Sequence, residues 1–312
     1  MSEPTSPFAI LLEKFWLDWR ERFSRLDRLL QLGVEVLEDQ VPQEFPPGFF
    51  NDHLAFRWDG SRGVGHLRPI QFAEPVGLDE MIGVERPITR LIRNIEQFVS
   101  DLPANHVLLY GERGTGKSTA VRALLPRFGS RRLRIVEVVK QDLIHLPNVL
   151  KALSGVDHKF LIFCDDLSFD EGEAGFRELK AALEGSLEAP PENIKIVATS
   201  NRRHLMPEYM AENRDVRMDE KGELRLSESL EEKLALADRF GLALQFTSFD
   251  QETYLEIVNH YIEKAKLDLS EAEVRARALR FALDRSSRSG RTAKQFVDDL
   301  AGRVGLGEIP SS

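Results

Sequence analysis

The chain has 312 residues, of which 42% are hydrophobic and 30% charged, the balance of a soluble globular protein with room for one large domain and a smaller one. Its formal net charge is −9, which argues against a broad nucleic-acid-binding surface but leaves room for a local basic patch. No segment holds the roughly 18 consecutive apolar residues of a membrane span, and the first residues lack the pattern of a secretory signal. A single cysteine, Cys164, excludes an internal disulfide and fits a reducing compartment, so we expect a cytoplasmic protein.

The first part of the chain is predicted to be a helical extension followed by a linker. Residues 8–38 carry apolar side chains near helical spacing, including several aromatic ones that either pack on the core or dock a partner. A Pro-rich passage at 41–48 and a Gly-rich one at 58–65 then interrupt the pattern. We therefore predict that residues 1–75 form an N-terminal helical extension and linker.

The centre of the chain alternates between strands and helices. Apolar runs predict strands at 106–110, 133–138, 159–165, 194–199 and 242–246. Helical patterns predict helices at 78–102, from Lys117 onward, at 143–153 and at 175–184. Because strands that alternate with helices build a parallel sheet covered on both faces, we predict an α/β nucleotide-binding core over residues 76–248.

The remaining parts of the chain read differently. Residues 249–312 show helical patterns only, which predicts a small all-helical lid. Residues 206–232 form a charged insertion, in which 216–226 suggests a hairpin that either contacts a substrate or is a solvated loop. The roles of the adjacent Arg202 and Arg203 stay open, because exposed arginines are often only solvated or salt-bridged.

The segment Gly111-Glu-Arg-Gly-Thr-Gly-Lys-Ser118 follows an apolar strand and precedes a helix, as a phosphate-binding P-loop does. Its backbone N–H groups and the start of the following helix would face a phosphate chain. Lys117 would reach the terminal phosphates, and Ser118 would ligate magnesium. The nucleotide-binding positions that we predict here are Gly111, Glu112, Arg113, Gly114, Thr115, Gly116, Lys117, Ser118 and Thr119.

Polar side chains end two of the later predicted strands, at the edge where parallel sheets bind ligands. Asp165 would hold magnesium, and Asp166 would orient and polarise the water that attacks the γ-phosphate. Asn201 would hydrogen-bond that water or the γ-phosphate. The alternative for each is an ordinary strand cap or turn former.

With these motifs, the later Asp238-Arg-Phe-Gly241 and the helical C-terminal unit, residues 76–312 resemble the AAA+ superfamily of P-loop ATPases. Within it, stretches such as Phe163-Cys-Asp-Asp-Leu-Ser-Phe and Ala198-Thr-Ser-Asn-Arg-Arg-His-Leu-Met-Pro are similar to the bacterial AAA+ family known as domain of unknown function number 815. The resemblance implies an AAA+ fold, ATP and Mg²⁺ as cofactors, and a homo-oligomer. It implies no particular macromolecular substrate.

The resemblance also implies further site residues. Arg239 would be an arginine finger acting on the site of a neighbouring subunit, with a salt bridge as the alternative. Arg291 would be the second sensor arginine, although Lys294, one helical turn later, would replace it if the alignment slips by three residues. The alternative for both is a solvated basic helix end. Ile82 and Gly83 would line the adenine pocket, with ordinary loop packing as the alternative.

One departure from the family pattern concerns the catalytic acid. Many AAA+ motors have Glu where this chain has Asp166, a side chain shorter by about 1.5 Å. We therefore expect slow or partner-stimulated hydrolysis, because a small displacement of a catalytic group can cost about 10²-fold in rate.

Two functions from different classes follow from the sequence. The first is Mg²⁺-dependent ATP hydrolysis by an oligomer that remodels or loads an unidentified protein or nucleic acid. The second is an ATP-dependent switch or adaptor that recruits such a partner with little hydrolysis. Phosphorylation of a small molecule has less support, because the implied lid and finger suit an assembling ATPase.

Overall fold

The computed structural model describes residues 43–61, 65–71, 77–168, 174–184, 191–201 and 236–308, together with Trp19, Arg25, Arg28 and four residues of a small hairpin. The predicted N-terminal helices at 8–38 otherwise lie outside the described residues, as do Arg202 and Arg203. No helix in the described ranges is both long enough and apolar enough to cross a membrane.

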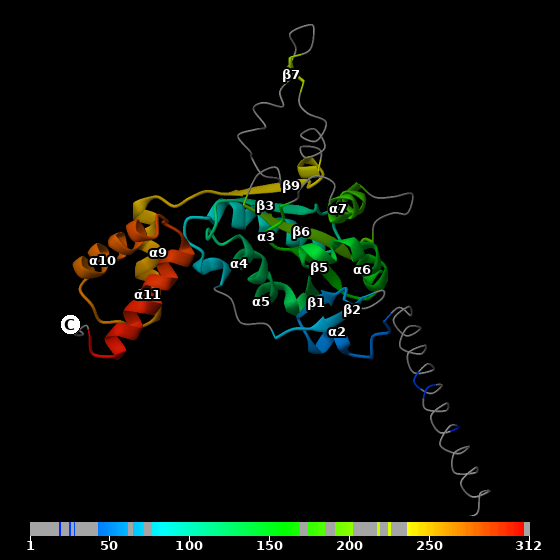
Figure 1. Ribbon diagram of the computed structural model, residues 1–312, viewed down its shortest axis with the longest axis horizontal. Coiled ribbons are helices and arrows are strands. Elements are labelled where there is room, and N and C mark those ends of the chain that lie inside the picture. Colours follow the sequence, from blue (N-terminus) through cyan, green and yellow to red (C-terminus); the bar gives the residue numbers. More distant parts are fainter. Residues whose placement is uncertain are drawn as a thin grey trace, which may run out of the picture.

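A seven-stranded sheet forms the centre of the molecule (Figure 1). Its strand order is β2-β1-β4-β5-β6-β3-β9, and all neighbouring strands are parallel except β1 and β2. The strands are β1 (Ala55–Asp59), β2 (His66–Pro69), β3 (Val107–Gly111), β4 (Leu133–Glu137), β5 (Lys159–Cys164), β6 (Ile194–Ser200) and β9 (Leu242–Phe246).

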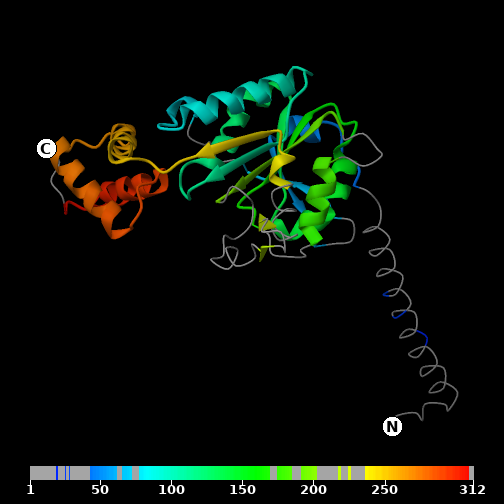
Figure 2. The ribbon, with the colours of Figure 1, turned by 90° about the horizontal axis from the view of Figure 1, so that it is seen from above.

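Helices cover both faces of this sheet, and three more form a unit at one end (Figure 2). One face carries α3 (Glu85–Val99), α4 (Lys117–Arg122) and α5 (Leu124–Phe128), and the other carries α6 (Leu146–Leu153) and α7 (Ala174–Glu184). The short α2 (Phe49–Asp52) precedes β1. The end unit, which we call the lid, consists of α9 (Gln251–Lys264), α10 (Glu271–Asp284) and α11 (Gly290–Gly305).

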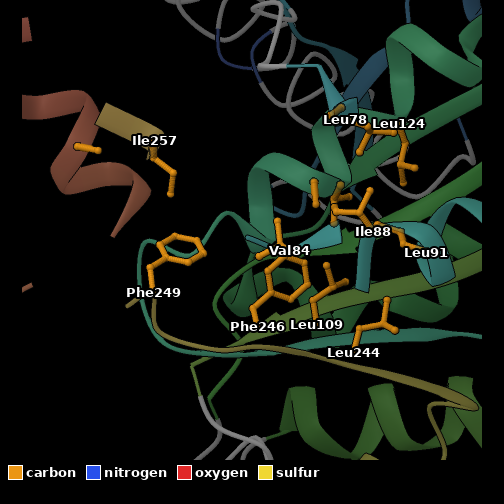
Figure 3. Packing of buried hydrophobic residues seen from close by; sticks show 14 of the residues in the cluster. Leu78, Val84, Ile88, Leu91, Leu109, Leu124, Leu244, Phe246, Phe249 and Ile257 are labelled. Carbon is orange, nitrogen blue, oxygen red and sulfur yellow. The ribbon is translucent and has the colours of Figure 1, made fainter. Parts of the chain in front are cut away.

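The two faces of the sheet are hydrophobic because the central strands are apolar along their whole length. In β5, Phe160 to Cys164 are all buried, as expected for a strand that is covered on both faces. Figure 3 shows part of the core on the α3 side, where Ile88 and Leu91 lie against Leu109 and Phe246 of the sheet. This packing fixes the carboxyl ends of β3, β5 and β6, which carry the predicted phosphate-site residues.

The five predicted strands are confirmed, with ends that differ by one residue at most. The predicted helix at 78–102 is shorter than expected: only Leu78–Glu80 is helical, as a 3-10 turn, before α3 begins at Glu85. Gly83 interrupts it, because its φ of 78° is a left-handed conformation that an α-helix does not contain. The hairpin predicted around 216–226 is present as the antiparallel pair β7 (Arg217–Met218) and β8 (Leu224–Arg225).

Strands β1 and β2 were not predicted. They fall in the segment that we assigned to the extension and linker, yet β1 pairs with β4 and extends the central sheet. Their side chains alternate instead of forming an apolar run: Phe56 and Trp58 are buried, while Arg57 and Asp59 are only partly so. The division of the chain at residues 75 and 248 remains a prediction.

Candidate functional site

A cavity of about 590 Å³ lies between the sheet edge and the lid, which is within the usual size range of small-molecule sites. It brings together four parts of the chain: the P-loop, the ends of β5 and β6, the loop before α3, and helices α9 and α11. Its lining includes most of the predicted site residues, namely Ile82, Arg113, Gly114, Thr115, Gly116, Lys117, Ser118, Thr119, Asp165, Asp166, Asn201 and Arg291.

Lys117 lies at the centre of the P-loop. Its Nζ donates to the carbonyl oxygens of Gly111 at 2.7 Å and Glu112 at 2.6 Å, and to Oδ1 of Asn201 at 3.2 Å. Only 6% of the residue is exposed, and burial lowers the pKa of the ammonium group, while the nearby Asp166 and Asp165 oppose this shift. The ammonium is therefore a desolvated cation whose present acceptors are neutral oxygens.

The two glycines at the ends of this loop have positive φ angles, a backbone conformation that favours glycine. Gly111 has a φ of 134°, and a Cβ there would collide with the backbone oxygen of Phe246. Gly116, with a φ of 99°, precedes the first residue of α4. The hydroxyl of Thr115 donates to the carbonyl of Glu112 at 2.8 Å, which closes the loop on itself.

Oxygen atoms from three elements converge beside Lys117. The Ser118 hydroxyl donates to Oδ1 of Asp165 at 2.5 Å, and the Thr199 hydroxyl donates to the same oxygen at 2.5 Å. The guanidinium of Arg122 is 3.8 Å from the other carboxylate oxygen. This donor set fits Mg²⁺, which prefers hard oxygen ligands and takes only one or two protein carboxylates beside phosphates and waters.

Asp166 follows β5 in a left-handed backbone conformation, with a φ of 51°. Its N–H donates to the Thr199 hydroxyl at 2.8 Å, and its carboxylate accepts a hydrogen bond from the amide of Asn201. Asn201 therefore connects Asp166 to Lys117 through the two ends of one amide group. The register of the sheet produces this arrangement. Cys164 of β5 pairs with Ala198 of β6, so the residues that follow these two positions lie next to each other.

Apolar side chains line part of the cavity where the core faces the lid. Met81, Ile82 and Val84 line this part from the core, Ile257 and Tyr261 line it from the lid, and Phe249 comes from the segment that joins the two. Gly83 is not among the lining residues: a Cβ there would lie 2.5 Å from Cγ2 of Thr253, so this glycine lets the loop approach α9 closely.

The lid contacts the P-loop directly at the start of α11. The N–H of Arg291 donates to the carbonyl of Gly114 at 3.4 Å, and a Cβ on Gly114 would lie 2.6 Å from Oγ of Ser289. Elsewhere, Glu80 before α3 accepts from Lys264 of α9 at 2.6 Å and lies 3.3 Å from His260, and the Lys264 contact lowers the pKa of the Glu80 carboxyl. These two contacts join the lid to the core beside the cavity.

Arg291 and Lys294 both line the cavity, but their side chains differ in their contacts. Lys294 forms an ion pair with Asp298 at 3.0 Å and lies 5.8 Å from the centre of the Tyr261 ring. The guanidinium of Arg291 has no hydrogen-bond or ion-pair partner among the residues that the structure describes. Arg291 therefore has the side chain that is free to meet a ligand.

Arg239 lies away from the cavity of its own chain. Its guanidinium forms an ion pair with Glu184, the last residue of α7, and its side chain is 27% exposed. The salt-bridge alternative thus has a partner, which is Glu184 and not the adjacent Asp238. Both groups of this pair keep exposed surface that a neighbouring molecule can reach.

The sequence analysis missed several lining residues. Thr199, which holds both Asp165 and Asp166, was signalled only by its place two residues before Asn201 on a buried strand. Arg122, Phe249 and Tyr261 had no local signal, because the folded chain alone brings them to the P-loop.

Solved structures with a similar fold are AAA+ ATPase domains. A point mutant of Thermotoga maritima RuvB is 16% identical, with a TM-score of 0.54 over 77% of this chain and 69% of that one. A second RuvB mutant is 17% identical, with a TM-score of 0.51 over 74% of this chain and 66% of that one. The FIGL-1 AAA domain, solved in complex with ADP, is 16% identical with a TM-score of 0.50 over 77% of both chains.

No curated protein matches the chain. A family model described as "Protein of unknown function (DUF815)" matches residues 51–304, which is most of the chain. Together with the P-loop, the parallel sheet and the helical lid, these comparisons confirm the resemblance inferred from the sequence. The chain belongs to the DUF815 family and has the fold of an AAA+ P-loop ATPase.

Proposed function

We propose that this protein binds ATP with Mg²⁺ in the cavity between core and lid and hydrolyses it. The observation that carries the proposal is the convergence of Lys117, the Ser118–Asp165 pair and the Asp166–Asn201 pair on one cavity. A cation, a magnesium-type oxygen pair and a carboxylate that can accept a proton are the parts that phosphoryl transfer to water requires.

The phosphate chain would lie along the P-loop. Lys117 would exchange its present carbonyl acceptors for phosphate oxygens. Charge favours this exchange, because the desolvated ammonium now contacts neutral oxygens and would then contact negatively charged ones. Ser118 and Asp165 would hold the magnesium ion. When bound, that ion neutralises charge on the β- and γ-phosphates.

Hydrolysis would depend on Asp166 and Asn201. The Asp166 carboxylate would orient the attacking water and accept its proton, and Asn201 would hold both Asp166 and the water in place. Ile82 and the other apolar residues of the lid side would take the adenine ring. Arg291 would contact the γ-phosphate from the lid, because its guanidinium lines the cavity without a partner in the described part of the chain.

We further propose that the active form is a cytoplasmic homo-oligomer in which Arg239 of one subunit completes the site of the next. Its distance from the cavity of its own chain and its partial exposure support a role in trans. The guanidinium would leave Glu184 when it meets the neighbouring phosphate. Loss of the γ-phosphate would then alter the lid and subunit contacts and so remodel or load a bound macromolecule.

A second candidate is a switch that binds ATP and recruits a partner with little hydrolysis. The observation that favours it is the hydrogen bond from Asn201 to the carboxylate of Asp166. The Asp166 side chain is already shorter than the Glu side chain of many AAA+ motors. Held against Asn201, this shorter side chain reaches less far toward an attacking water than a Glu would.

The deciding experiment is Mg²⁺-dependent phosphate release measured across protein concentration. The parent is compared with Lys117→Ala, Asp166→Asn and Arg239→Ala, each checked for folding by circular dichroism. Turnover per subunit that rises with concentration in the parent and collapses in all three variants supports the ATPase. Tight ATP binding with negligible parent turnover supports the switch, and no ATP binding by the parent rejects both.

A further inference from the structure

The outer side of α3 carries three arginines, Arg86, Arg90 and Arg93, all exposed. Their spacing of four and three residues places them on one side of the helix, and we call this set the arginine stripe. Ile88 and Leu91 of the same helix are buried on the opposite side, against the core. The helix, cyan in Figure 2, runs along the outer surface of the core, so the stripe faces solvent.

The charge of the stripe is not neutralised within the described part of the chain. None of its three guanidinium groups has a hydrogen-bond or ion-pair partner there. The two acids of the helix are engaged elsewhere: Glu85 accepts from the N–H of Gly83 at 2.7 Å, and Glu96 forms an ion pair with Arg131. Three neighbouring arginines therefore have no ion-pair partner in the described part of a protein whose net charge is −9.

We propose that the arginine stripe binds the phosphate backbone of a nucleic acid. Arginine suits this ligand because its guanidinium is always charged and can donate two parallel hydrogen bonds to a phosphate. Arg86 and Arg93 are separated along the helix axis by about 10 Å, the rise over which one strand of a duplex presents about three phosphates. The stripe is therefore long enough to meet about three phosphates of one strand.

The surroundings of the stripe favour a nucleic acid over a protein partner. Protein interfaces usually have an apolar centre. Within the described ranges the exposed large hydrophobic residues lie elsewhere, and α3 carries none of them. Two acidic residues at the start of α9, its N-cap Asp250 and Glu252, lie beyond the start of α3, where Gly83 meets Thr253. They repel a polyanion, so the bound strand extends from Arg86 toward the C-terminal end of the helix.

The stripe is also close to the nucleotide cavity in the chain. Arg86 is two residues from Val84, which lines that cavity. The inference rests on the proposed function, because it names nucleic acid as the macromolecule that the ATPase would remodel or load. Binding itself needs no hydrolysis, so a failure of either idea is seen separately.

The test is fluorescence anisotropy with the full chain and labelled DNA of about 20 nucleotides, as a single strand and as a duplex, at salt concentrations from about 50 to 200 mM. The stripe variant is Arg86→Gln/Arg90→Gln/Arg93→Gln. The control variant, Arg275→Gln/Arg277→Gln/Arg280→Gln on α10, removes the same number of positive charges from another helix. ATP hydrolysis and oligomer mass are measured for all three proteins.

We expect the stripe variant to bind at least about tenfold more weakly at about 50 mM salt and to lose about 2 to 3 from the slope of log affinity against log salt. The control variant is expected to bind like the parent, and basal hydrolysis is expected to be unchanged in both. The two DNA forms show which backbone geometry the stripe prefers.

Three results overturn the inference. The first is a parent that binds neither DNA form, and the second is equal weakening in the stripe and control variants, which reports net charge alone. The third is a stripe variant that binds DNA like the parent; if its oligomer mass is also smaller, the stripe is assigned to contact with a second copy of the chain.

Discussion

At the scale of single residues, the backbone at Asp166 gives a physical reason for Asp in place of Glu. Its φ of 51° is in the left-handed region, which Asp and Asn occupy more readily than residues with longer side chains. The short side chain also lets the carboxylate reach Asn201. The left-handed backbone therefore favours Asp at this position, whereas reach toward a substrate favours the longer Glu.

We predict that Asp166→Asn abolishes turnover while ATP still binds. The amide keeps the volume and the left-handed backbone but accepts no proton, so phosphate release should fall by about 10² to 10⁴. Asp101→Asn is the matched control, since Asp101 also has a left-handed backbone, with a φ of 59°, and lies outside the cavity. A variant that turns over like the parent would show that Asp166 is not the base.

A second residue-scale prediction concerns pH. His106 is partly buried, its Nδ1 accepts the N–H of Ile196 at 2.9 Å, and burial lowers its pKa to about 4. His106 therefore takes up a proton near pH 6.5 in the unfolded chain but only near pH 4 in the folded chain. The free energy of unfolding falls as the pH drops from about 6.5 to 4. The loss is at most about 3 kcal/mol.

Urea unfolding at pH 7 and pH 4 measures this loss. His106→Gln keeps an acceptor for Ile196 but has no group that titrates in this range, so it should lose less stability than the parent on acidification. The difference between the two proteins isolates His106 from the other groups that titrate. Equal losses in both would assign the acid sensitivity to other groups.

At the scale of elements, the contact between the P-loop and α11 makes a prediction about the lid. Gly114 and Gly155 share a φ of 76°, so alanine strains both backbones by about 1 kcal/mol or more. A Cβ on Gly114 also meets Ser289 at 2.6 Å, whereas a Cβ on Gly155 meets nothing within 4 Å. We expect Gly114→Ala to push the start of α11 away and weaken ATP binding by about tenfold or more.

Gly155→Ala is the matched control for backbone strain. It should lower the melting temperature but leave ATP affinity unchanged, as measured by titration with a fluorescent nucleotide. If both variants lose affinity equally, the effect comes from general destabilisation and the lid contact does not govern binding.

The same elements show what the sequence could predict. The P-loop and the strands β3, β5 and β6 were predictable, because a local motif and continuous apolar runs lie within short segments. The hairpin of β1 and β2 was not, since its alternating pattern lies between turn-forming residues and its pairing with β4 is distant in sequence. The role of Thr199 and the lid contact at Gly114 were not predicted either. The register of β5 and β6 creates the first, and the packing of α11 on the P-loop creates the second.

At the scale of the whole molecule, the two halves of the proposed site lie on different surfaces of one chain. Lys117 and Asp166 line the cavity, whereas Arg239 pairs with Glu184 outside it. If Arg239 acts in trans, a subunit without Lys117 can still serve its neighbour. This separation allows a complementation test that a site contained in one chain does not.

We predict that equal mixing of Lys117→Ala and Arg239→Ala restores turnover to about a quarter of the parent value, because in random assembly that share of sites has both an intact P-loop and an intact neighbouring finger. The matched control mixes Lys117→Ala with Asp166→Asn. Both of those changes disable the cavity of the subunit that carries them, so no mixed site is complete. Recovery in the first mixture alone places Arg239 in the neighbour's site, whereas no recovery in either one returns Arg239 to a structural role with Glu184.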